Sequence, residues 1–305
     1  MRLALALAAS SALAAGPRAG LEGIRNRTIT VAGVERSYLV HLPPSYDRKR
    51  AFPLVLAFHG GASNPAAMAR FSGLDGKADE AGFIVAYPAG SGRLPRVLTW
   101  NAGRCCGYAS AEKVDDVAFV RALIEDLAAR VHLDRKRIYA TGISNGAQMA
   151  YRLAAELSDQ VAAIAPVSGS LEVDVPRVGR PVPVVHFHGT DDTYLPFAGG
   201  RGPRSLATGP HASVEQSVGT WVRLDECRPA PVVQELPATV SDGTSVVRRS
   251  YEGCREGAEV VLYEIRGGGH TWPGRPSAER LLGTTTRNLS ANDVMWDFFA
   301  RHALR

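Results

Sequence analysis

The chain has 305 residues, a net charge of +5, and ordinary fractions of hydrophobic (45%) and charged (21%) residues. This composition excludes a wholly disordered chain, a collagen and a coiled coil, and the length is enough for one large hydrophobic core or two modest ones. Basic residues are spread along the sequence without forming a block, so no nucleic-acid partner is expected.

Residues 1–14 have the layout of a secretory signal peptide. Arg2 precedes an apolar run, and small residues stand before a cut near Ala14-Ala15. The alternative is a retained membrane anchor, but the apolar run is short for crossing a bilayer. We therefore expect a secreted protein, extracellular or periplasmic, with no membrane anchor.

Strand-like and helical segments alternate along the rest of the chain. Two short runs, Arg27–Val31 and Arg36–Leu42, predict an antiparallel hairpin that opens a sheet. Apolar runs then predict strands, and amphipathic runs between them predict helices. The predicted strands are Phe52–Phe58, Phe83–Tyr87, Arg137–Ala140, Val161–Val167, Val182–Phe187, Val246–Tyr251 and Val260–Ile265, and the predicted helices are Ala66–Ala81, Val117–Val131, Ala147–Leu157, Val214–Arg223 and Asp293–His302.

This alternation predicts an α/β fold with a mostly parallel central sheet and helices on both faces. Asp115 and Asp116 stand where the N-cap of the second predicted helix belongs. The sequence has no internal repeat and no long linker, so residues 20–305 are expected to form a single domain. We expect a monomer.

The turn Gly142–Gly146 carries the pattern G-x-S-x-G between a predicted strand and a predicted helix. In this setting the two glycines permit a sharp turn that exposes the hydroxyl of Ser144 at the helix N-terminus, where the helix dipole favours developing negative charge. The pattern therefore predicts that Ser144 is a nucleophile. The alternative is a glycine-rich turn with a capping serine.

A serine nucleophile needs a base, and the base needs an orienting carboxylate. Asp191 and Asp192 follow the strand Val182–Phe187, and His270 follows the strand Val260–Ile265 after a run of glycines. The order serine, carboxylate, histidine is the one found in folds whose nucleophile stands in a G-x-S-x-G turn between a strand and a helix. Each of the three groups here also follows a predicted strand. The offset from the strand end favours Asp192 over Asp191, so the predicted triad is Ser144, Asp192 and His270.

Acyl transfer by a serine nucleophile also needs donors for the oxyanion of the tetrahedral intermediate. We expect the backbone N–H groups of Gly61 and Asn145 to supply them. Trp100 and Trp272 flank the predicted crevice and are candidate substrate contacts together with His59, although core packing is an equal alternative for the two tryptophans. Three other histidines are expected at the surface: His132, His211 and His302.

The four cysteines are an even number, as suits an oxidising compartment. The simplest pairing joins Cys227 to Cys254, and leaves the adjacent Cys105 and Cys106 either bonded to each other or reduced. Neither C-x-x-C nor a histidine cluster is present, so no metal site is expected.

The chain resembles the secreted esterases of the poly(3-hydroxybutyrate) depolymerase type, which have the α/β-hydrolase fold and are related to the feruloyl and acetylxylan esterases of carbohydrate esterase family 1. The resemblance covers residues from about 27 to 300. The motifs that carry it are His59-Gly60-Gly61, Trp100-Asn101, Cys105-Cys106-Gly107, Val114–Val117, Gly142–Gly146, His188–Asp192 and Gly268–Gly274.

This resemblance implies a serine hydrolase of carboxylic esters with no cofactor and no large lid domain. It supports the triad of Ser144, Asp192 and His270 and the Cys227–Cys254 bridge. The implied substrates are polyester oligomers, with aryl or acetyl esters of polysaccharides as the alternative.

Two other functions use the same scaffold. A peptidase of the prolyl-oligopeptidase type would normally carry a propeller domain, for which 305 residues leave no space. A non-catalytic ligand-binding protein would typically have lost one member of the triad, and all three residue types are present here.

Overall fold

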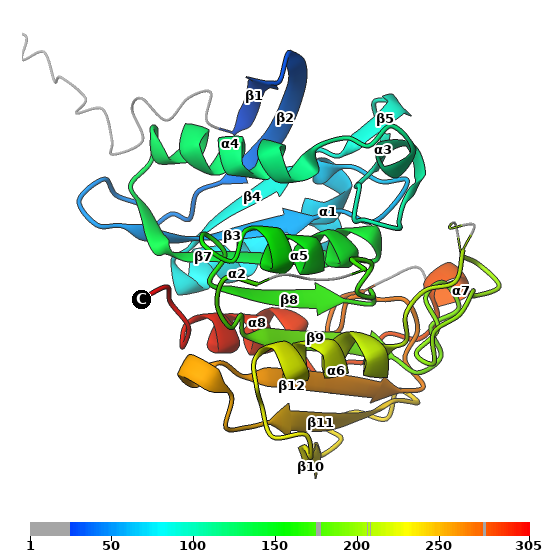
Figure 1. The fold of residues 1–305 in the computed structure, drawn as a ribbon. Coiled ribbons are helices and arrows are strands. Elements are labelled where there is room, and N and C mark those ends of the chain that lie inside the picture. Colours follow the sequence, from blue (N-terminus) through cyan, green and yellow to red (C-terminus); the bar gives the residue numbers. More distant parts are fainter. Residues whose placement is uncertain (1–24, 175–177, 206, 208, 277–278) are drawn as a thin grey trace, which may run out of the picture.

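The computed structural model describes residues 25–174, 178–205, 207, 209–276 and 279–305, so the predicted signal peptide lies outside the described residues. One sheet of ten strands runs through the molecule (Figure 1). Its strands, in spatial order, are β1 (Asn26–Val31), β2 (Val34–His41), β4 (Ile84–Pro88), β3 (Phe52–Phe58), β7 (Leu133–Ile143), β8 (Ala163–Val167), β9 (Val184–Gly189), β12 (Val260–Arg266), β11 (Ser245–Tyr251) and β10 (Val232–Glu235).

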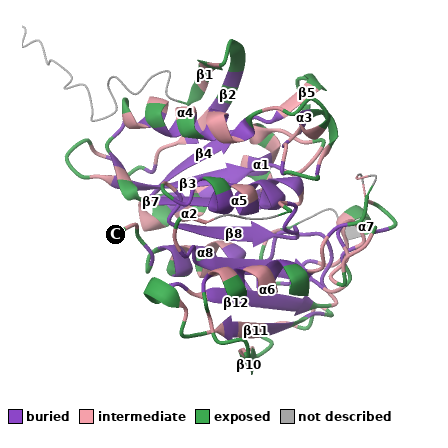
Figure 2. Ribbon diagram, viewed as in Figure 1, coloured by how far each residue is buried: buried purple, intermediate pink, exposed green. Residues whose placement is uncertain are grey.

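The strands from β4 to β12 in this order are parallel to one another, and the strands at both edges are antiparallel. Every residue of β3, β4, β8 and β9 is buried (Figure 2), which explains why these strands read as continuous apolar runs rather than as alternating ones. The prediction of a mostly parallel sheet is confirmed.

Helices cover both faces of the sheet, as predicted (Figure 1). Side chains that alternate along β3 enter two separate cores: Leu54 and Leu56 belong to the core under α4, α5 and α6, and Val55 and Ala57 to the core under α1, α2 and α8. The helices are α1 (Pro65–Ser72), α2 (Leu74–Ala81), α3 (Gly107–Ala111), α4 (Asp116–Ala128), α5 (Asn145–Glu156), α6 (Val214–Leu224), α7 (Glu279–Leu282) and α8 (Ala291–Phe299), with a 3₁₀ turn η1 (Arg255–Gly257).

The predicted helix Ala66–Ala81 is two helices, α1 and α2. Gly73 separates them with φ of +60°, a left-handed conformation that glycine adopts without a Cβ penalty, and its N–H bonds to the carbonyl of Ala69 to end α1. The predicted N-cap of α4 is confirmed at Asp115, whose side chain accepts the N–H of Ala118 at 2.9 Å.

Two short segments escaped prediction. The loop after β4 contains a small hairpin, β5 (Ser91–Leu94) and β6 (Val97–Thr99), and the edge strand β10 is exposed at all four residues. Both lack the apolar continuity that marks the buried strands, so their pairing could not be read from the sequence.

All four cysteines are in disulfides. The bridge Cys227–Cys254 joins the chain after α6 to the turn before η1, as predicted, and Cys105 is bonded to its neighbour Cys106 in the loop before α3. No helix within the described part of the chain is long and apolar enough to cross a membrane.

Candidate active site

The three residues of the predicted triad follow three strands of the parallel part of the sheet. Ser144 follows β7, Asp192 follows β9 and His270 follows β12. Because parallel strands end at one edge of a sheet, the loops that carry these residues converge there. Ser144 and His270 line one cavity of about 270 Å³, which we call the first cavity.

The turn at Ser144 has the sharp geometry expected of a nucleophile. Ser144 has φ of +59° and ψ of −124°, a conformation that non-glycine residues rarely adopt, and it directly precedes α5. A Cβ on Gly142 would lie 2.6 Å from the carbonyl oxygen of Phe58, and one on Gly146 would collide with the same oxygen. Only glycine at both positions allows the turn to pack against the end of β3.

Asp192 rather than Asp191 faces the histidine. The Nδ1 of His270 lies 2.7 Å from Oδ2 of Asp192, and Oδ1 of Asp192 accepts the backbone N–H groups of Tyr194 at 2.8 Å and Leu195 at 2.9 Å. The Asp191 carboxylate instead accepts the hydroxyl of Thr190. Both oxygens of Asp192 are therefore held in place, which fixes the orientation of the His270 ring.

The electrostatics of this pair favour a charged carboxylate. Burial alone would raise the pKa of Asp192, but the charge and hydrogen bond of His270 outweigh it, with smaller help from His188 and the Leu195 N–H, and the pKa is held below its ordinary value. An ionised Asp192 accepts the Nδ1–H of His270, so the remaining lone pair of the neutral ring is at Nε2, where a base is needed.

A buried chain of hydrogen bonds supports the loop that carries Asp192. The hydroxyl of Tyr151 lies 2.8 Å from Nδ1 of His186, Nε2 of His186 lies 3.1 Å from Nδ1 of His188, and Nε2 of His188 lies 2.8 Å from the carbonyl oxygen of Leu195. Burial lowers the pKa of both histidines, so the rings are neutral and each can donate once and accept once along the chain. Both histidines are thus buried side chains whose ring nitrogens have hydrogen-bond partners.

The two expected oxyanion donors belong to neighbouring loops. Gly61 and Ser144 line the first cavity together, and a Cβ on Gly61 would lie 3.7 Å from the Cβ of Asn145. Trp100 joins the two loops: its indole N–H donates to the carbonyl of His59 at 2.9 Å, and its backbone N–H donates to Oδ1 of Asn145 at 2.7 Å. The distance between the two loops is thus set by a buried side chain.

The prediction that His59, Trp100 and Trp272 contact substrate is wrong. All three side chains are fully buried, and none lines a described cavity beside Ser144. Burial lowers the pKa of His59 to about 4, and its Nε2 accepts the N–H of Gly90, which leaves it a structural role in the loop. The indole N–H of Trp272 donates to Asn292 at 2.8 Å, so core packing accounts for both tryptophans.

Other side chains form the walls of the first cavity. Tyr194 lies over the imidazole of His270 with ring centroids 4.9 Å apart, and Phe71 and Met68 contribute apolar surface from α1. The sequence offered only a weak indication of these roles, namely the position of Tyr194 two residues after Asp192. A larger cavity of about 770 Å³ lies elsewhere, between β2, α1 and the β5–β6 hairpin, and contains no triad residue.

Among the described residues, no group of three His, Cys, Asp or Glu side chains is placed to hold a metal ion.

Comparison with known proteins identifies the family. Residues 36–175 match the esterase PHB depolymerase family model. A protein of Nocardia uniformis subsp. tsuyamanensis named "Putative esterase NocK" is 32% identical over 289 residues, which cover 89% of this chain and 81% of that protein. The chain belongs to the esterase PHB depolymerase family. It is a carboxylic ester hydrolase, as predicted.

Several relatives of this esterase are named feruloyl esterases. Feruloyl esterase C of Emericella nidulans is 28% identical over 270 residues, which cover 87% of this chain and 83% of that protein. Feruloyl esterase B of Piromyces equi is 29% identical over 245 residues, covering 77% of this chain but only 42% of that protein.

Solved structures agree on the fold of this esterase. The acetyl xylan esterase from Aspergillus awamori superimposes with a TM-score of 0.59 at 14% sequence identity, covering 90% of this chain and 98% of that one. The predicted α/β-hydrolase fold is confirmed, and the ten-stranded sheet carries no large lid domain among the described residues.

Proposed function

We propose that this esterase works through an acyl-enzyme formed on Ser144, with His270 as the base and Asp192 as the residue that orients it. The observation that carries the proposal is the 2.7 Å contact between His270 and Asp192, at a cavity that His270 shares with Ser144. The backbone conformation of Ser144, directly before α5, is further support.

The reaction has two halves. Ser144 Oγ attacks the ester carbonyl while Nε2 of His270 takes its proton, and the N–H groups of Gly61 and Asn145 stabilise the oxyanion. His270 then gives the proton to the departing alcohol. Water, activated by the same imidazole, attacks the acyl-enzyme and releases the acid and free Ser144.

The variant Ser144→Ala tests this mechanism. It should lower kcat for p-nitrophenyl butyrate by at least about a thousandfold while circular dichroism and the unfolding midpoint stay close to those of the wild type. A folded Ser144→Ala protein that hydrolyses the ester at the wild-type rate would remove Ser144 from the mechanism.

For the substrate, we propose oligomers of a hydroxyalkanoate polyester, in line with the family, and feruloyl esters as the second candidate. The feruloyl esterases among the relatives favour the second. The apolar first cavity, with Phe71 and Met68 in its wall, fits an aliphatic or an aromatic group.

Activity on a poly(3-hydroxybutyrate) suspension and on methyl ferulate, with p-nitrophenyl butyrate as a common control, separates these candidates. Clearing of the suspension supports the polyester. Release of ferulate without clearing supports the feruloyl ester. Hydrolysis of the control alone would contradict both substrate proposals and leave the mechanism in place.

We also propose that the protein is secreted and that residues 20–305 act as one catalytic domain. The signal-like pattern of residues 1–14 and the Cys227–Cys254 disulfide support export to an oxidising compartment. A sheet that takes strands from β1 to β12 supports a single domain. Protein sequencing of the N-terminus of the exported chain tests the cut near Ala14-Ala15.

A further inference from the structure

A second cavity, of about 170 Å³, also borders Ser144. Both cavities are lined by Gly61, Ser144 and Tyr194. His270 lines only the first cavity, and Asn145 only the second. The proposed nucleophile therefore borders two cavities that differ in their lining: His270 lines the first, and Asn145 lines the second.

This arrangement assigns the alcohol part and the acyl part of a bound ester to different cavities. The departing alcohol oxygen must lie within reach of His270, which gives it a proton, so the alcohol belongs in the first cavity. The acyl group leaves the same carbonyl carbon in another direction, and the second cavity is the described space that opens there.

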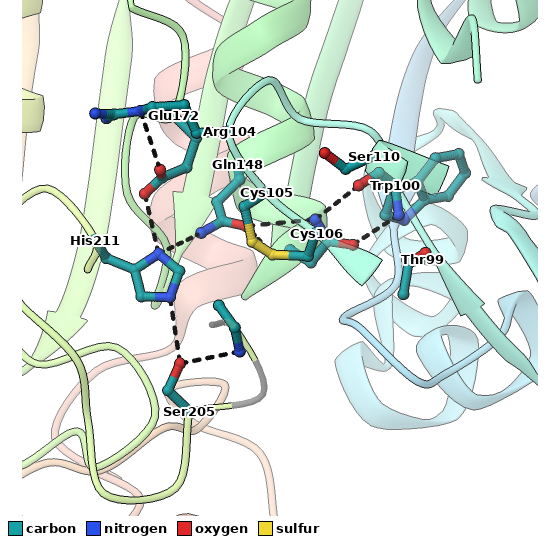
Figure 3. Close-up of a disulfide and its surroundings, with 12 residues drawn as sticks. Thr99, Trp100, Arg104, Cys105, Cys106, Ser110, Gln148, Glu172, Ser205 and His211 are labelled. Carbon is teal, nitrogen blue, oxygen red and sulfur yellow. Dashed lines mark hydrogen bonds and ion pairs between the residues drawn. A yellow bond between two sulfur atoms is a disulfide. The ribbon is translucent and has the colours of Figure 1, made fainter. Parts of the chain in front are cut away.

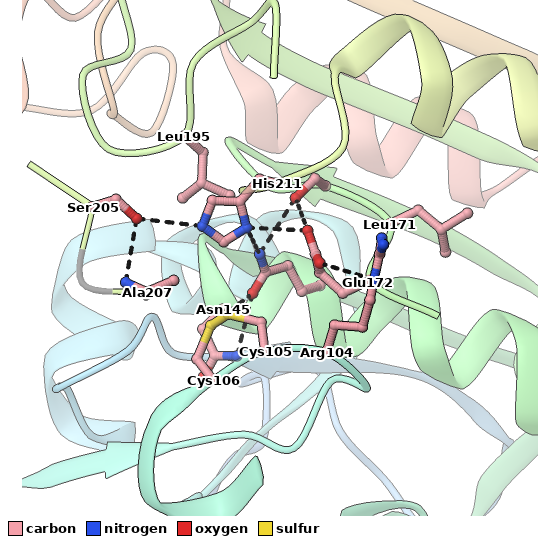
Figure 4. Close-up of polar contacts among 12 residues, drawn as sticks. Arg104, Cys105, Cys106, Asn145, Leu171, Glu172, Leu195, Ser205, Ala207 and His211 are labelled. Atoms are coloured by element: carbon pink, nitrogen blue, oxygen red, sulfur yellow. Dashed lines mark hydrogen bonds and ion pairs between the residues drawn. A yellow bond between two sulfur atoms is a disulfide. The ribbon is translucent and has the colours of Figure 1, made fainter. Parts of the chain in front are cut away.

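The wall of the second cavity includes two buried polar side chains, His211 and Gln148. Figure 4 shows His211 beside Glu172 and Ser205. His211, expected at the surface, is instead only 7% exposed, and Glu172 and Gln148 are each 1% exposed. The Nδ1 of His211 lies 3.1 Å from Oε1 of Glu172, an oxygen that also accepts the Ser170 hydroxyl at 2.6 Å. The His211 surface prediction is wrong because this carboxylate gives its ring a buried partner.

The Glu172 carboxylate determines which ring nitrogen of His211 can accept a hydrogen bond at the second cavity. When Nδ1–H donates to Glu172, Nε2 is the ring atom of His211 that can accept a hydrogen bond. Its partner there is the hydroxyl of Ser205 at 3.3 Å, a long contact. A hydroxyl on a bound substrate could take the same place.

Gln148 is the second weakly bonded group. It lies on α5, one turn beyond Ser144, and its contacts are at the outer limit of hydrogen bonding: Asn145 Nδ2, Ser170 Oγ and His211 Nδ1 all lie 3.4 Å from its amide atoms. Figure 3 shows the contact with His211. The sulfur of Cys106 lies at the same distance and also lines the cavity. A buried amide without a good partner gains free energy when a ligand supplies one.

We propose that the second cavity is the acyl subsite and that His211 and Gln148 bind a hydroxyl group carried by the acyl chain. This inference rests on the proposed function. The hydroxyl donates to Nε2 of His211 and accepts from the amide of Gln148, whereas an acyl chain without it leaves both groups unpaired. An aliphatic 3-hydroxyl and the phenolic hydroxyl of a hydroxycinnamate have this chemistry in common.

Two substrate pairs that differ only in the hydroxyl test the proposal: ethyl 3-hydroxybutyrate against ethyl butyrate, and methyl 4-hydroxycinnamate against methyl cinnamate. The readout is the ratio of kcat/KM with and without the hydroxyl. The wild type should prefer the hydroxylated ester in at least one pair, and the pair that shows the preference identifies the source of the hydroxyl.

The variant His211→Asn keeps a donor toward Glu172 and removes the acceptor at the position of Nε2, so it should lower that ratio about tenfold. Gln148→Met leaves the His211–Glu172 pair intact and should lower the ratio in the same direction, which covers the case in which His211→Asn fails to fold. The matched control is His132→Asn, the same substitution at an exposed histidine, and should leave the ratio unchanged.

The outcomes separate this inference from the proposed mechanism. Suppose that hydrolysis of p-nitrophenyl butyrate depends on Ser144. If the wild type then shows no preference for the hydroxylated ester in either pair, or if its preference survives both variants, the acyl subsite is overturned and the mechanism stands. Hydrolysis that persists in Ser144→Ala would overturn the mechanism, and the subsite with it.

Discussion

Individual residues at this site are held by partners that lie far away in the sequence. Ser144 keeps its unusual backbone angles because Gly142 and Gly146 let the turn pack against β3, and because its N–H bonds to the carbonyl of Val167 at 3.1 Å. The local pattern around Ser144 was enough to predict this turn. It could not predict Trp100 as the link between the two oxyanion loops, because nothing in the sequence distinguishes a buried tryptophan from an exposed one.

The adjacent aspartates offer a matched pair of variants. Asp192→Asn should lower kcat/KM by roughly 10³–10⁴, because the amide no longer stabilises the charged imidazole and can select the wrong tautomer of His270. Asp191→Asn changes an exposed neighbour bonded to Thr190 and should stay within about twofold of the wild type. Steady-state kinetics on p-nitrophenyl butyrate measures both, and equal effects of the two substitutions would contradict the assignment.

At the scale of helices and strands, the hydrophobic pattern of the sequence predicted most elements and missed the strands that have few apolar residues. Buried parallel strands such as β3 and β9 are continuous apolar runs, which the sequence displays directly. The strand β7 begins at Leu133, earlier than predicted, because Leu133 pairs with Phe52 of β3, before a shift in register that leads to the pairing of Ile138 with Leu54. The division between α1 and α2 depends on the conformation of one glycine, Gly73, which composition does not reveal.

A buried ion pair fastens β2 to α4. Arg36 lies 2.6 Å from Asp116, with both side chains nearly inaccessible, and the other Asp116 oxygen accepts the N–H of Asn101 at 2.8 Å. Arg36→Met should lower the free energy of unfolding by about 3–5 kcal/mol, because it leaves a buried carboxylate without its counter-charge. Urea denaturation measures this loss.

An exposed ion pair provides the control for the Arg36→Met variant. Arg135 lies 2.6 Å from Glu125 with both side chains more than half exposed, so Arg135→Met should change the free energy of unfolding by no more than about 1 kcal/mol. If Arg36→Met were as mild as Arg135→Met, the ion pair would have no special part in joining β2 to α4.

For the whole molecule, the resemblance and the alternation of strands and helices were sufficient to predict the fold and the strands that Ser144, Asp192 and His270 follow. The proposed acyl subsite was not predictable in the same way. Gln148, Glu172 and His211 meet from α5, the chain after β8 and the chain before α6, and no motif connects them. Only the folded chain brings these three side chains together, with Gln148 and His211 in the wall of the cavity that Ser144 borders and Glu172 bonded to His211.

One buried carboxyl should make global stability depend on pH. Burial raises the pKa of Asp225 to about 7, and one of its oxygens has no hydrogen-bond partner among the described residues. Between about pH 4 and pH 7 the folded state keeps a proton that the unfolded state releases, so the contribution of Asp225 to stability falls as pH rises through this window. The buried His59 acts in the opposite sense within the same window, so the wild-type curve alone cannot isolate Asp225.

The variant Asp225→Asn isolates that contribution. Relative to the wild type, its free energy of unfolding should increase by a few kcal/mol, at most about 4 kcal/mol, as the pH rises from about 4 to about 7. Denaturant unfolding of both proteins across this range measures the difference. A difference that stays constant with pH would show that Asp225 is ionised throughout.

Labelling with a fluorophosphonate tests the central claim, that ester hydrolysis proceeds through Ser144, most directly. Peptide mapping by mass spectrometry should find one group per chain, attached to Ser144, and loss of p-nitrophenyl butyrate hydrolysis should follow the labelled fraction in direct proportion. Full activity in a chain labelled completely at Ser144, or inactivation through a label at another residue with Ser144 unmodified, would contradict it.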